Sequence, residues 1–399
     1  MIRKNPFANF LINLKSNVKL DIIGHFCGHL VIAVYDETVK CLIVTSYFMT
    51  NYQVTITNDI LNLISEIDEF KGKWQAINTL SPDRLKMLKK SATIESIASS
   101  TRIEGVKLTD AQVETLLSNI RKTSFKNRDE EEVAGYSDAM DLILESFEDL
   151  KITENHLKQL HSVLLKHSSK DIRHRGEYKK LDNHVVAFDA NGKEIGIVFK
   201  TATPFETPMK MADLLEWTNK AFELKETHPL IITGIFIVVF LAIHPFQDGN
   251  GRLSRILTNL LLLKLGYSYI QYSSLESIIE DNKDLYYKNL RDCQTTLETK
   301  KIRFENWILF FLKSLKKQKD NLEKKVKSEK ILQENFGELH LEILKILKNH
   351  NRLAVSEIQR LTGANRSTIK VKLRDLIEMK KIQSFGKGRG VTYAISEAI

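Results

Sequence analysis

One stretch of the chain constrains its fold more than any other: an apolar run, a short polar turn and a second apolar run. The first run, 229–243, contains no charged residue, which predicts a helix buried on all sides. The second, 252–265, is rich in helix formers and is followed by Gly266, a common C-cap residue. The first run spans fewer than the roughly 18 residues of a membrane helix. The pattern therefore predicts two core helices joined by the turn, and no membrane partner.

The turn itself, His244 to Arg255, reads HPFQDGNGRLSR. Histidine, with a pKa of about 6.5 when unperturbed, suits proton abstraction near neutral pH. A glycine-rich turn that opens a helix directs backbone N–H groups toward an anion. Arg252 and Arg255, three residues apart, share a helix face, and Asp248 offers a carboxylate to a metal. The alternative is an ordinary loop, but the joint occurrence of these groups predicts chemistry on a nucleoside polyphosphate.

The turn resembles the Fic family motif, H-x-F-x-(D/E)-G-N-G-R-x-x-R, at every specified position. The resemblance implies a mainly helical enzyme that transfers AMP from ATP, with Mg²⁺, to a hydroxyl of a target protein, the chain itself included. It implies that His244 is the general base, that Phe246 anchors the loop and that Asp248 holds the magnesium. The nucleotide-binding residues would be Gly249, Asn250, Gly251, Arg252, Leu253, Ser254, Arg255 and, further on, Tyr286.

A second match lies upstream, where SSTRIEG resembles the family's inhibitory motif, (S/T)-x-x-x-E-(G/N). Ser100 and Glu104 occupy its polar positions, and their spacing of four predicts one helical face, on which Ser100 can orient Glu104. The resemblance implies that Glu104 pairs with Arg255 and withholds it from the γ-phosphate of ATP. Without the downstream motif, the same residues would read as a capped helix with a surface carboxylate.

Two further features lie on either side of the motif. The segment 185–198 alternates apolar and polar residues around Asn191-Gly192 and predicts a β-hairpin. In the family such a hairpin is a flap that aligns the target by strand addition; the alternative is a plain surface hairpin. Tyr286 and its neighbour Tyr287 fall on a predicted helix. The resemblance implies an aromatic residue lining the adenine pocket there, and the alternative is core packing.

The last third of the chain is basic, with 22 Lys and Arg against 11 Asp and Glu in 301–399. Within it, 313–330 is a charge run that predicts a solvated connecting helix. Helices over 339–347, 354–361 and 365–379, followed by a hairpin over 381–395, predict a winged helix-turn-helix. DNA is then an expected partner, contacted by Arg366, Lys370, Lys387 and Arg389. The alternative is a dimerisation or protein-docking module.

The expected fold class is therefore mainly α: a Fic-type helical bundle with a β-hairpin flap, plus a C-terminal winged helix-turn-helix domain. The expected divisions are an N-terminal extension, 1–55, an inhibitory region, 56–130, a catalytic domain, 131–315, a basic connector, 316–335, and the winged helix, 336–399. In the extension, two apolar runs within 26–48 predict a β-hairpin around Asp36 to Thr38.

Composition agrees with this interpretation. The three cysteines, Cys27, Cys41 and Cys293, are scattered and form no C-x-x-C pair, which predicts a reducing cytoplasm and no zinc site. The family resemblance favours a homodimer, the commonest symmetric oligomer. Two other functions stay open: a DNA-binding regulator whose Fic domain senses nucleotide, and a Fic enzyme that removes AMP or transfers another phosphate group.

Overall fold

A computed structural model gives the structure of the chain. It describes residues 18–26, 29–36, 52–76, 82–119, 125–183, 185–188, 194–299, 301–335, 337–350, 352–386 and 388–396.

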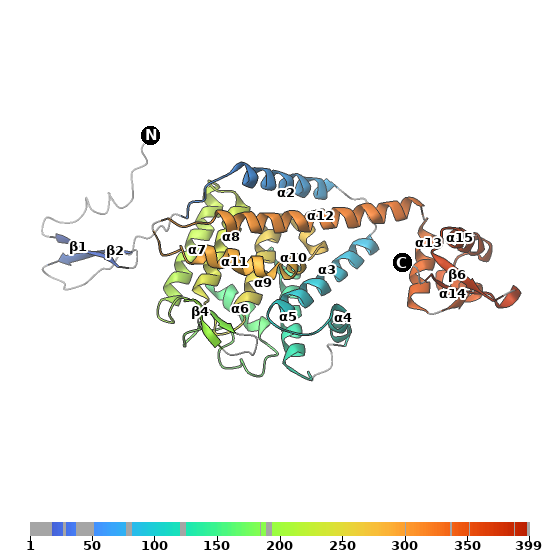
Figure 1. Ribbon diagram of the computed structural model, residues 1–399, viewed down its shortest axis with the longest axis horizontal. Coiled ribbons are helices and arrows are strands. Elements are labelled where there is room, and N and C mark those ends of the chain that lie inside the picture. Colours follow the sequence, from blue (N-terminus) through green and yellow to red (C-terminus); the bar gives the residue numbers. More distant parts are fainter. Residues whose placement is uncertain are drawn as a thin grey trace.

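The structure is mainly helical (Figure 1). The described α-helices are α2 (Asn58–Ala76), α3 (Pro82–Ile103), α4 (Asp110–Ser118), α5 (Arg128–Ser146), α6 (Glu154–Leu164), α7 (Thr207–Leu224), α8 (Pro229–Ile243), α9 (Asn250–Lys264), α10 (Leu275–Asp281), α11 (Lys283–Gln294), α12 (Glu305–Asn335), α13 (Glu338–Asn349), α14 (Val355–Thr362) and α15 (Arg366–Glu378). The 3₁₀ helices and strands are β1 (Val18–Phe26), β2 (His29–Asp36), β3 (Val185–Phe188), β4 (Glu194–Phe199), η1 (Ser268–Tyr272), β5 (Leu353–Ala354), β6 (Ile382–Phe385), η2 (Gly388–Gly390) and β7 (Thr392–Ile395).

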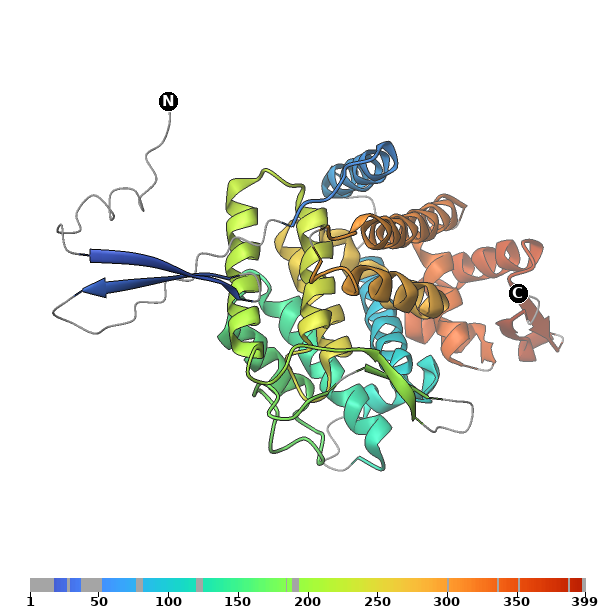
Figure 2. The ribbon, with the colours of Figure 1, turned by 60° about the vertical axis from the view of Figure 1, so that its left-hand side comes forward.

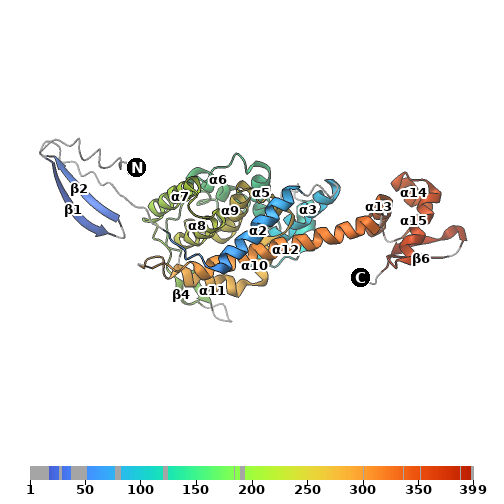
Figure 3. The same cartoon turned by 90° about the horizontal axis from the view of Figure 1, so that it is seen from above.

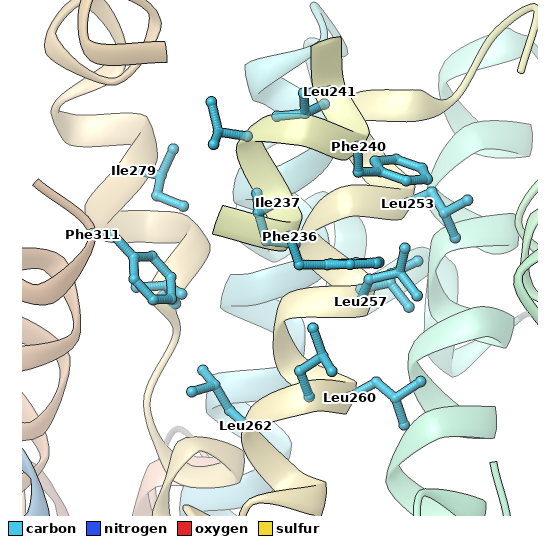
Figure 4. Close-up of a cluster of buried hydrophobic side chains, with 14 of the residues drawn as sticks. Phe236, Ile237, Phe240, Leu241, Leu253, Leu257, Leu260, Leu262, Ile279 and Phe311 are labelled. Atoms are coloured by element: carbon cyan, nitrogen blue, oxygen red, sulfur yellow. The ribbon is translucent and has the colours of Figure 1, made fainter. Parts of the chain in front are cut away.

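Helices α8 and α9 form the centre of the bundle, as the two apolar runs predict. Every residue of α8 from Leu230 to Ile243 is buried, because the helix is apolar on all faces and packs against α7, α9, α11 and α12. Phe236 and Phe240 of α8 lie against leucines of α9 (Figure 4). At its end α9 is capped by Gly266, whose φ of 83° suits glycine. The polar turn at 244–249 thus joins two buried helices.

The basic run 313–330 is more than a solvated connector. It lies within α12, a single helix of 31 residues that crosses the predicted boundary at 315–316. Leu315, Leu322 and Val326 on one face are buried in the main core, and α12 packs along α2. Most charged side chains described between 313 and 327 lie on the other faces, whereas Lys319 is buried beside Asp320. Beyond the bundle, α12 leads to the C-terminal unit (Figures 1 and 3).

The C-terminal unit has a core of its own, separate from that of the bundle. Ile343 of α13, Ile358 of α14 and Leu373 of α15 meet there, together with Ile382 of β6. Its three antiparallel strands follow the order β5-β7-β6. The helices and hairpin fall where the sequence predicts them, whereas the two-residue strand β5 was not predicted.

Two hairpins lie outside these cores. The predicted hairpin at 185–198 is present as β3 and β4, which pair antiparallel. The N-terminal hairpin was predicted in the wrong place: β1 pairs with β2 so that Phe26 opposes His29, whereas the predicted turn at 36–38 comes at the end of β2. Alternation of apolar residues locates strands but does not say which pair turns. The predicted second strand beyond residue 40 lies outside the described residues.

Among the described residues, no helix is both long and apolar enough to span a membrane. The most apolar one, α8, has 15 residues.

The close contact between α5 and α6 generates a stability prediction. A Cβ at Gly135 would overlap the backbone oxygen of Leu164, whereas one at Gly72, in α2, would meet nothing within 4 Å. Gly135→Ala should lower the free energy of unfolding by about 2 kcal/mol, because overpacking against rigid backbone outweighs the gain in helix propensity. Gly72→Ala should leave it unchanged or raise it by up to about 1 kcal/mol. Urea denaturation of both variants checks this; equal stabilities would contradict the contact.

Candidate functional site

The predicted base, His244, sits at the C-cap of α8. Its backbone is left-handed, with φ 53° and ψ 59°, and Pro245 follows, so the helix ends there. Its Nδ1 lies 3.2 Å from the carbonyl oxygen of Leu241. With the proton on Nδ1 donated to that carbonyl, Nε2 keeps a free lone pair. Burial and the positive charge of Lys179 lower the pKa of His244 to about 4. The imidazole is therefore neutral at physiological pH and can accept a proton.

The side chain of Asn250 fixes the shape of the turn. Its Oδ1 accepts from the backbone N–H of Phe246 at 2.9 Å, and its Nδ2 donates to the carbonyl of the same residue at 2.6 Å. Phe246 itself is fully buried, as the anchoring role predicts. Because these two bonds occupy its side-chain amide, Asn250 would assist anion binding by shaping the loop and not by donating to the anion.

His161 of α6, which the sequence interpretation missed, packs against the same turn. Its ring stacks on Phe246 with centroids 3.8 Å apart. Its Nδ1 accepts from the N–H of Gly176 at 2.8 Å, so the Nε2 proton is the one available to the carbonyl of Asp248, 3.0 Å away. Burial lowers the pKa of His161 to about 4, against the hydrogen bond to Asp248. His161 is therefore neutral, and it supports the loop by stacking on Phe246 and bonding to Asp248.

The start of α9 has the backbone geometry that suits an anion. Gly249 is its N-cap, with a φ of 79°, and the N–H groups of the first helical residues have no partner within the helix. They add to the positive end of the helix dipole. A Cβ on Gly251 would overlap Oε1 of Glu104. A carboxylate from another part of the chain therefore already lies against this cradle.

Asp248 is an ionised carboxylate surrounded by cations. Its Oδ1 accepts from the N–H of Gly249 at 2.6 Å, and Arg252 and Lys170 lie 3.1 Å from Oδ1 and Oδ2. Although burial opposes ionisation, the charge of Arg252 and the hydrogen bond from Lys170 lower the pKa of Asp248 to about 2.

Arg252 is almost fully buried, yet its guanidinium is not saturated. Its Nη1 lies 2.8 Å from Glu132, which is also buried, and its Nη2 lies 3.1 Å from Asp248. Its Nε has no hydrogen-bond partner among the described residues. A buried donor without a partner is costly, so the site has donor capacity for an anion.

Arg255 is held by the upstream motif. Its Nε donates to Oγ of Ser100 at 2.7 Å and its Nη2 to the carbonyl of Ser100 at 3.0 Å. The same Nη2 donates to Oε1 of Glu104 at 2.7 Å. The predicted Glu104–Arg255 pair is thus present. Burial opposes the charge of Glu104, but Arg255 holds its pKa below the ordinary value.

The predicted role of Ser100 needs a correction. Helix α3 ends at Ile103, so Glu104 has left the helix, and the hydroxyl of Ser100 acts on Arg255 instead of on Glu104 directly. Arg102 and Lys283 fix this helix end: Arg102 makes a two-pronged bond to Glu280 of α10 at 2.7 and 2.9 Å, and Lys283 donates to the carbonyl of Ile103 at 2.6 Å. Glu104 is therefore presented from a rigid position.

Three other predicted nucleotide-binding side chains are buried. Leu253 points into the core beside Phe240 (Figure 4) and its N–H bonds to the carbonyl of Gly249. Ser254 is buried and donates to the carbonyl of Gly251 at 2.7 Å. Tyr286 is buried and packs edge-on against Trp307. Its hydroxyl also lies within hydrogen-bond reach of Ser254 and Arg255, so the residue belongs both to the core and to the surroundings of Arg255.

Part of the sequence is similar to that of known proteins. Residues 151–262, which include the whole turn, match the Fic/DOC family. "Protein adenylyltransferase Fic" of Drosophila mojavensis is 30% identical over 218 residues, 53% of this chain and 40% of that protein. Its counterpart in Drosophila virilis is 31% identical over 216 residues, 54% of this chain and 41% of that protein. The chain thus spans less than half the length of these relatives. Its residues 151–262 form a region similar to the Fic/DOC family.

Solved structures agree on the fold. A Fic family protein from Desulfovibrio desulfuricans G20 is 24% identical, with a TM-score of 0.60, and the match covers 87% of this chain and 99% of that one. Fic-1 from C. elegans is 19% identical, with a TM-score of 0.51, covering 68% of this chain and 72% of that one.

The lowered pKa of buried His161 generates a prediction about stability and pH. Its pKa is about 4 in the folded state against an ordinary 6.5, so the unfolded chain binds more protons between these values and stability falls as the pH drops from about 6.5 toward 4. His161→Gln should be less stable at pH 7 but should lose less stability over this range. Exposed His350→Gln is the control, with the wild-type slope. Urea unfolding at several pH values measures both; parallel curves for all three proteins would contradict the assignment.

Proposed function

We propose that this chain is a protein adenylyltransferase, which transfers AMP from ATP to a Ser, Thr or Tyr hydroxyl of a target protein. The observation that carries the proposal is the placement of a neutral His244 at one end of a turn whose other end is a helix N-terminus with Arg252 and Arg255. Base, anion cradle and cations then act on one substrate. The relatives named protein adenylyltransferase support the same activity.

The chemistry would be an in-line displacement at the α-phosphorus. The target oxygen forms a bond to that phosphorus while the bond to the bridging oxygen of the β-phosphate breaks, and pyrophosphate leaves. Nε2 of His244 takes the hydroxyl proton, since Nδ1 faces the carbonyl of Leu241. The backbone N–H groups of α9 and the donor of Arg252 stabilise negative charge on the phosphates. The products are AMP-protein and pyrophosphate.

Asp248 fits a magnesium ion that arrives with ATP. No group of three or more His, Cys, Asp or Glu side chains surrounds a common point in the described part of the chain. Mg²⁺ on a nucleotide needs only one or two protein carboxylates, since phosphates and water complete its shell. Asp248 is ionised and partly exposed, and would hold the ion in this way. When bound, magnesium neutralises phosphate charge.

We also propose that Glu104 inhibits the transfer. Its carboxylate lies over Gly251 at the anion cradle and engages Arg255, which the γ-phosphate of ATP would otherwise meet. A carboxylate and a phosphate compete for the same guanidinium. The inhibition would arise within one chain, whether or not the protein forms the expected homodimer.

One experiment tests both parts of this proposal. Glu104→Gly should raise AMP transfer, including onto the chain itself, by about 10- to 100-fold, because a charge-assisted hydrogen bond to the γ-phosphate is worth roughly 1.5–3 kcal/mol. Adding His244→Ala should reduce the rate by about 10²–10⁴, with ATP still bound. ATP labelled at the α-phosphate and mass spectrometry measure incorporation. Activity that persists in the double variant would exclude His244 as the base, and loss of AMP from a modified target would indicate the reverse reaction.

A second proposed function rests on the C-terminal unit, a DNA-binding winged helix-turn-helix. Its residues 337–396 hold 12 Lys and Arg against 5 Asp and Glu. Gly363, with a φ of 68°, forms the turn between α14 and α15. Helix α15 buries Ile369, Leu373 and Leu376, and its other faces expose Arg366, Ser367, Lys370, Val371 and Arg374. Such a face suits a major groove. Lys387 and the side chain of Arg389, predicted wing contacts, lie outside the described part.

This interface predicts a salt-dependent interaction. Lys370→Ala in the full chain should weaken binding to a random-sequence duplex and flatten the slope of log affinity against log salt by about 0.9, as one phosphate contact is lost. Lys345→Ala on α13 removes the same charge away from α15 and should keep the slope. Fluorescence anisotropy at graded salt measures both. No affinity at low salt would favour protein docking instead.

A further inference from the structure

A short segment after α6 runs beside the turn that carries His244. Tyr178 forms an antiparallel bridge with Phe246, and the N–H of Lys179 donates to the carbonyl of Pro245 at 2.8 Å. This segment connects α6 to the β3–β4 hairpin, which lies at the lower edge of the bundle in Figure 2. It is therefore placed to relate the hairpin to the turn.

The side chain of Lys179 is buried among oxygen atoms. Only 3% of the residue is exposed, and its Nζ donates to Oδ1 of Asn183 at 2.7 Å, Oγ1 of Thr201 at 3.0 Å and the carbonyl of Ile243 at 3.1 Å. Ile243 is the last residue of α8, whose C-terminal carbonyls have no partner in the helix and attract a cation. A buried ammonium is costly unless it is fully paired. Its three acceptors satisfy its three donors.

Asn183 completes the contact. Its Nδ2 donates to the carbonyl of Phe246 at 2.6 Å and to that of His244 at 3.3 Å, while its Oδ1 accepts from Lys179 and from Thr201. Thr201 comes two residues after the end of β4. Lys179 and Asn183 thus bond to the carbonyls on both sides of the imidazole and to the base of the hairpin. We name Lys179, Asn183 and Thr201 the turn clamp.

We propose that Lys179 is a positioning residue, which through the turn clamp fixes His244 relative to the β3–β4 hairpin. The proposal rests on the transfer function above, because it concerns where a hydroxyl aligned on the hairpin meets the base. Lys179 acts on the turn through backbone carbonyls and does not touch the nucleotide site at α9. Its loss should therefore change the chemical step more than ATP binding.

The charges around Lys179 and His244 set the direction in which the pKa of His244 should change when Lys179 is replaced. Burial lowers the pKa of Lys179 to about 8, with Asp182 and Glu206 favouring its charged form and Lys210 opposing it, so the ammonium is still mainly charged at pH 7. Around His244, the positive charge of Lys179 opposes protonation, while Glu104 and Asp248 favour it. Removing the charge of Lys179 therefore makes His244 easier to protonate.

The first measurement is kinetic and uses the Glu104→Gly chain. Lys179→Met should lower kcat for AMP transfer by about 10- to 100-fold, with KM for ATP changed by less than about threefold. Lys179→Arg keeps the charge and should recover part of the rate. Exposed Lys180→Met is the matched control and should leave kcat unchanged. Thermal unfolding of each variant confirms folding; where Lys179→Met does not fold, neutral but polar Lys179→Gln replaces it.

The second measurement needs no activity. The full chain, labelled with ¹⁵N-histidine, is titrated by NMR, and His244 is assigned by its loss in His244→Ala. The pKa of His244 should rise by about one unit in Lys179→Met or Lys179→Gln, and should stay unchanged in Lys179→Arg and Lys180→Met. An unchanged His244 pKa in a folded, neutral variant overturns the proposal, as does a kcat equal to that of Lys180→Met. Absence of AMP transfer from every variant refutes the proposed function instead, and the titration still decides the role of Lys179.

Discussion

The reciprocal bond between the Asn250 side chain and the backbone of Phe246 is the contact on which the site depends. It closes the turn between α8 and α9 at 2.6 and 2.9 Å. With the turn closed, the end of α8 presents His244 and the start of α9 presents the anion cradle. Because both helices are buried, the turn inherits their rigidity. The proposed catalytic loop is thus tied at both ends to the buried core.

The two ends of the turn have different charged neighbours. On the side of α8 the cation Lys179 satisfies backbone carbonyls, and burial keeps the histidine uncharged. On the side of α9 the guanidinium groups of Arg252 and Arg255 face the carboxylates of Glu132 and Glu104. In the proposed reaction, the α8 end of the turn would accept a proton and the α9 end would bind an anion. These two environments lie within a dozen residues of sequence, as proton transfer coupled to phosphate chemistry requires.

The sequence predicted the two central helices with their turn, and the hairpin that precedes them, because their signals are local: apolar periodicity, a Gly C-cap and an Asn-Gly turn. It predicted the Glu104–Arg255 contact only through family resemblance, since nothing local brings residues 151 positions apart together. His161, Lys179 and Asn183 were missed because a lone histidine or lysine has no pattern of its own; their roles arise from tertiary contacts. The misplaced N-terminal turn has the same origin, because strand pairing is decided beyond the strand.

The position of Glu104 has a consequence in terms of concentration. A carboxylate fixed to the same chain is a ligand that dilution cannot remove, so its effective concentration at Arg255 is set by geometry alone. The bonds from Arg102 to Glu280 and from Lys283 to Ile103 preserve that geometry. Under the proposed inhibition, a free nucleotide would compete with the Glu104 carboxylate as an ordinary solute. A partner that loosened α10 from α3 would then lower the local concentration of that carboxylate without approaching the proposed nucleotide site.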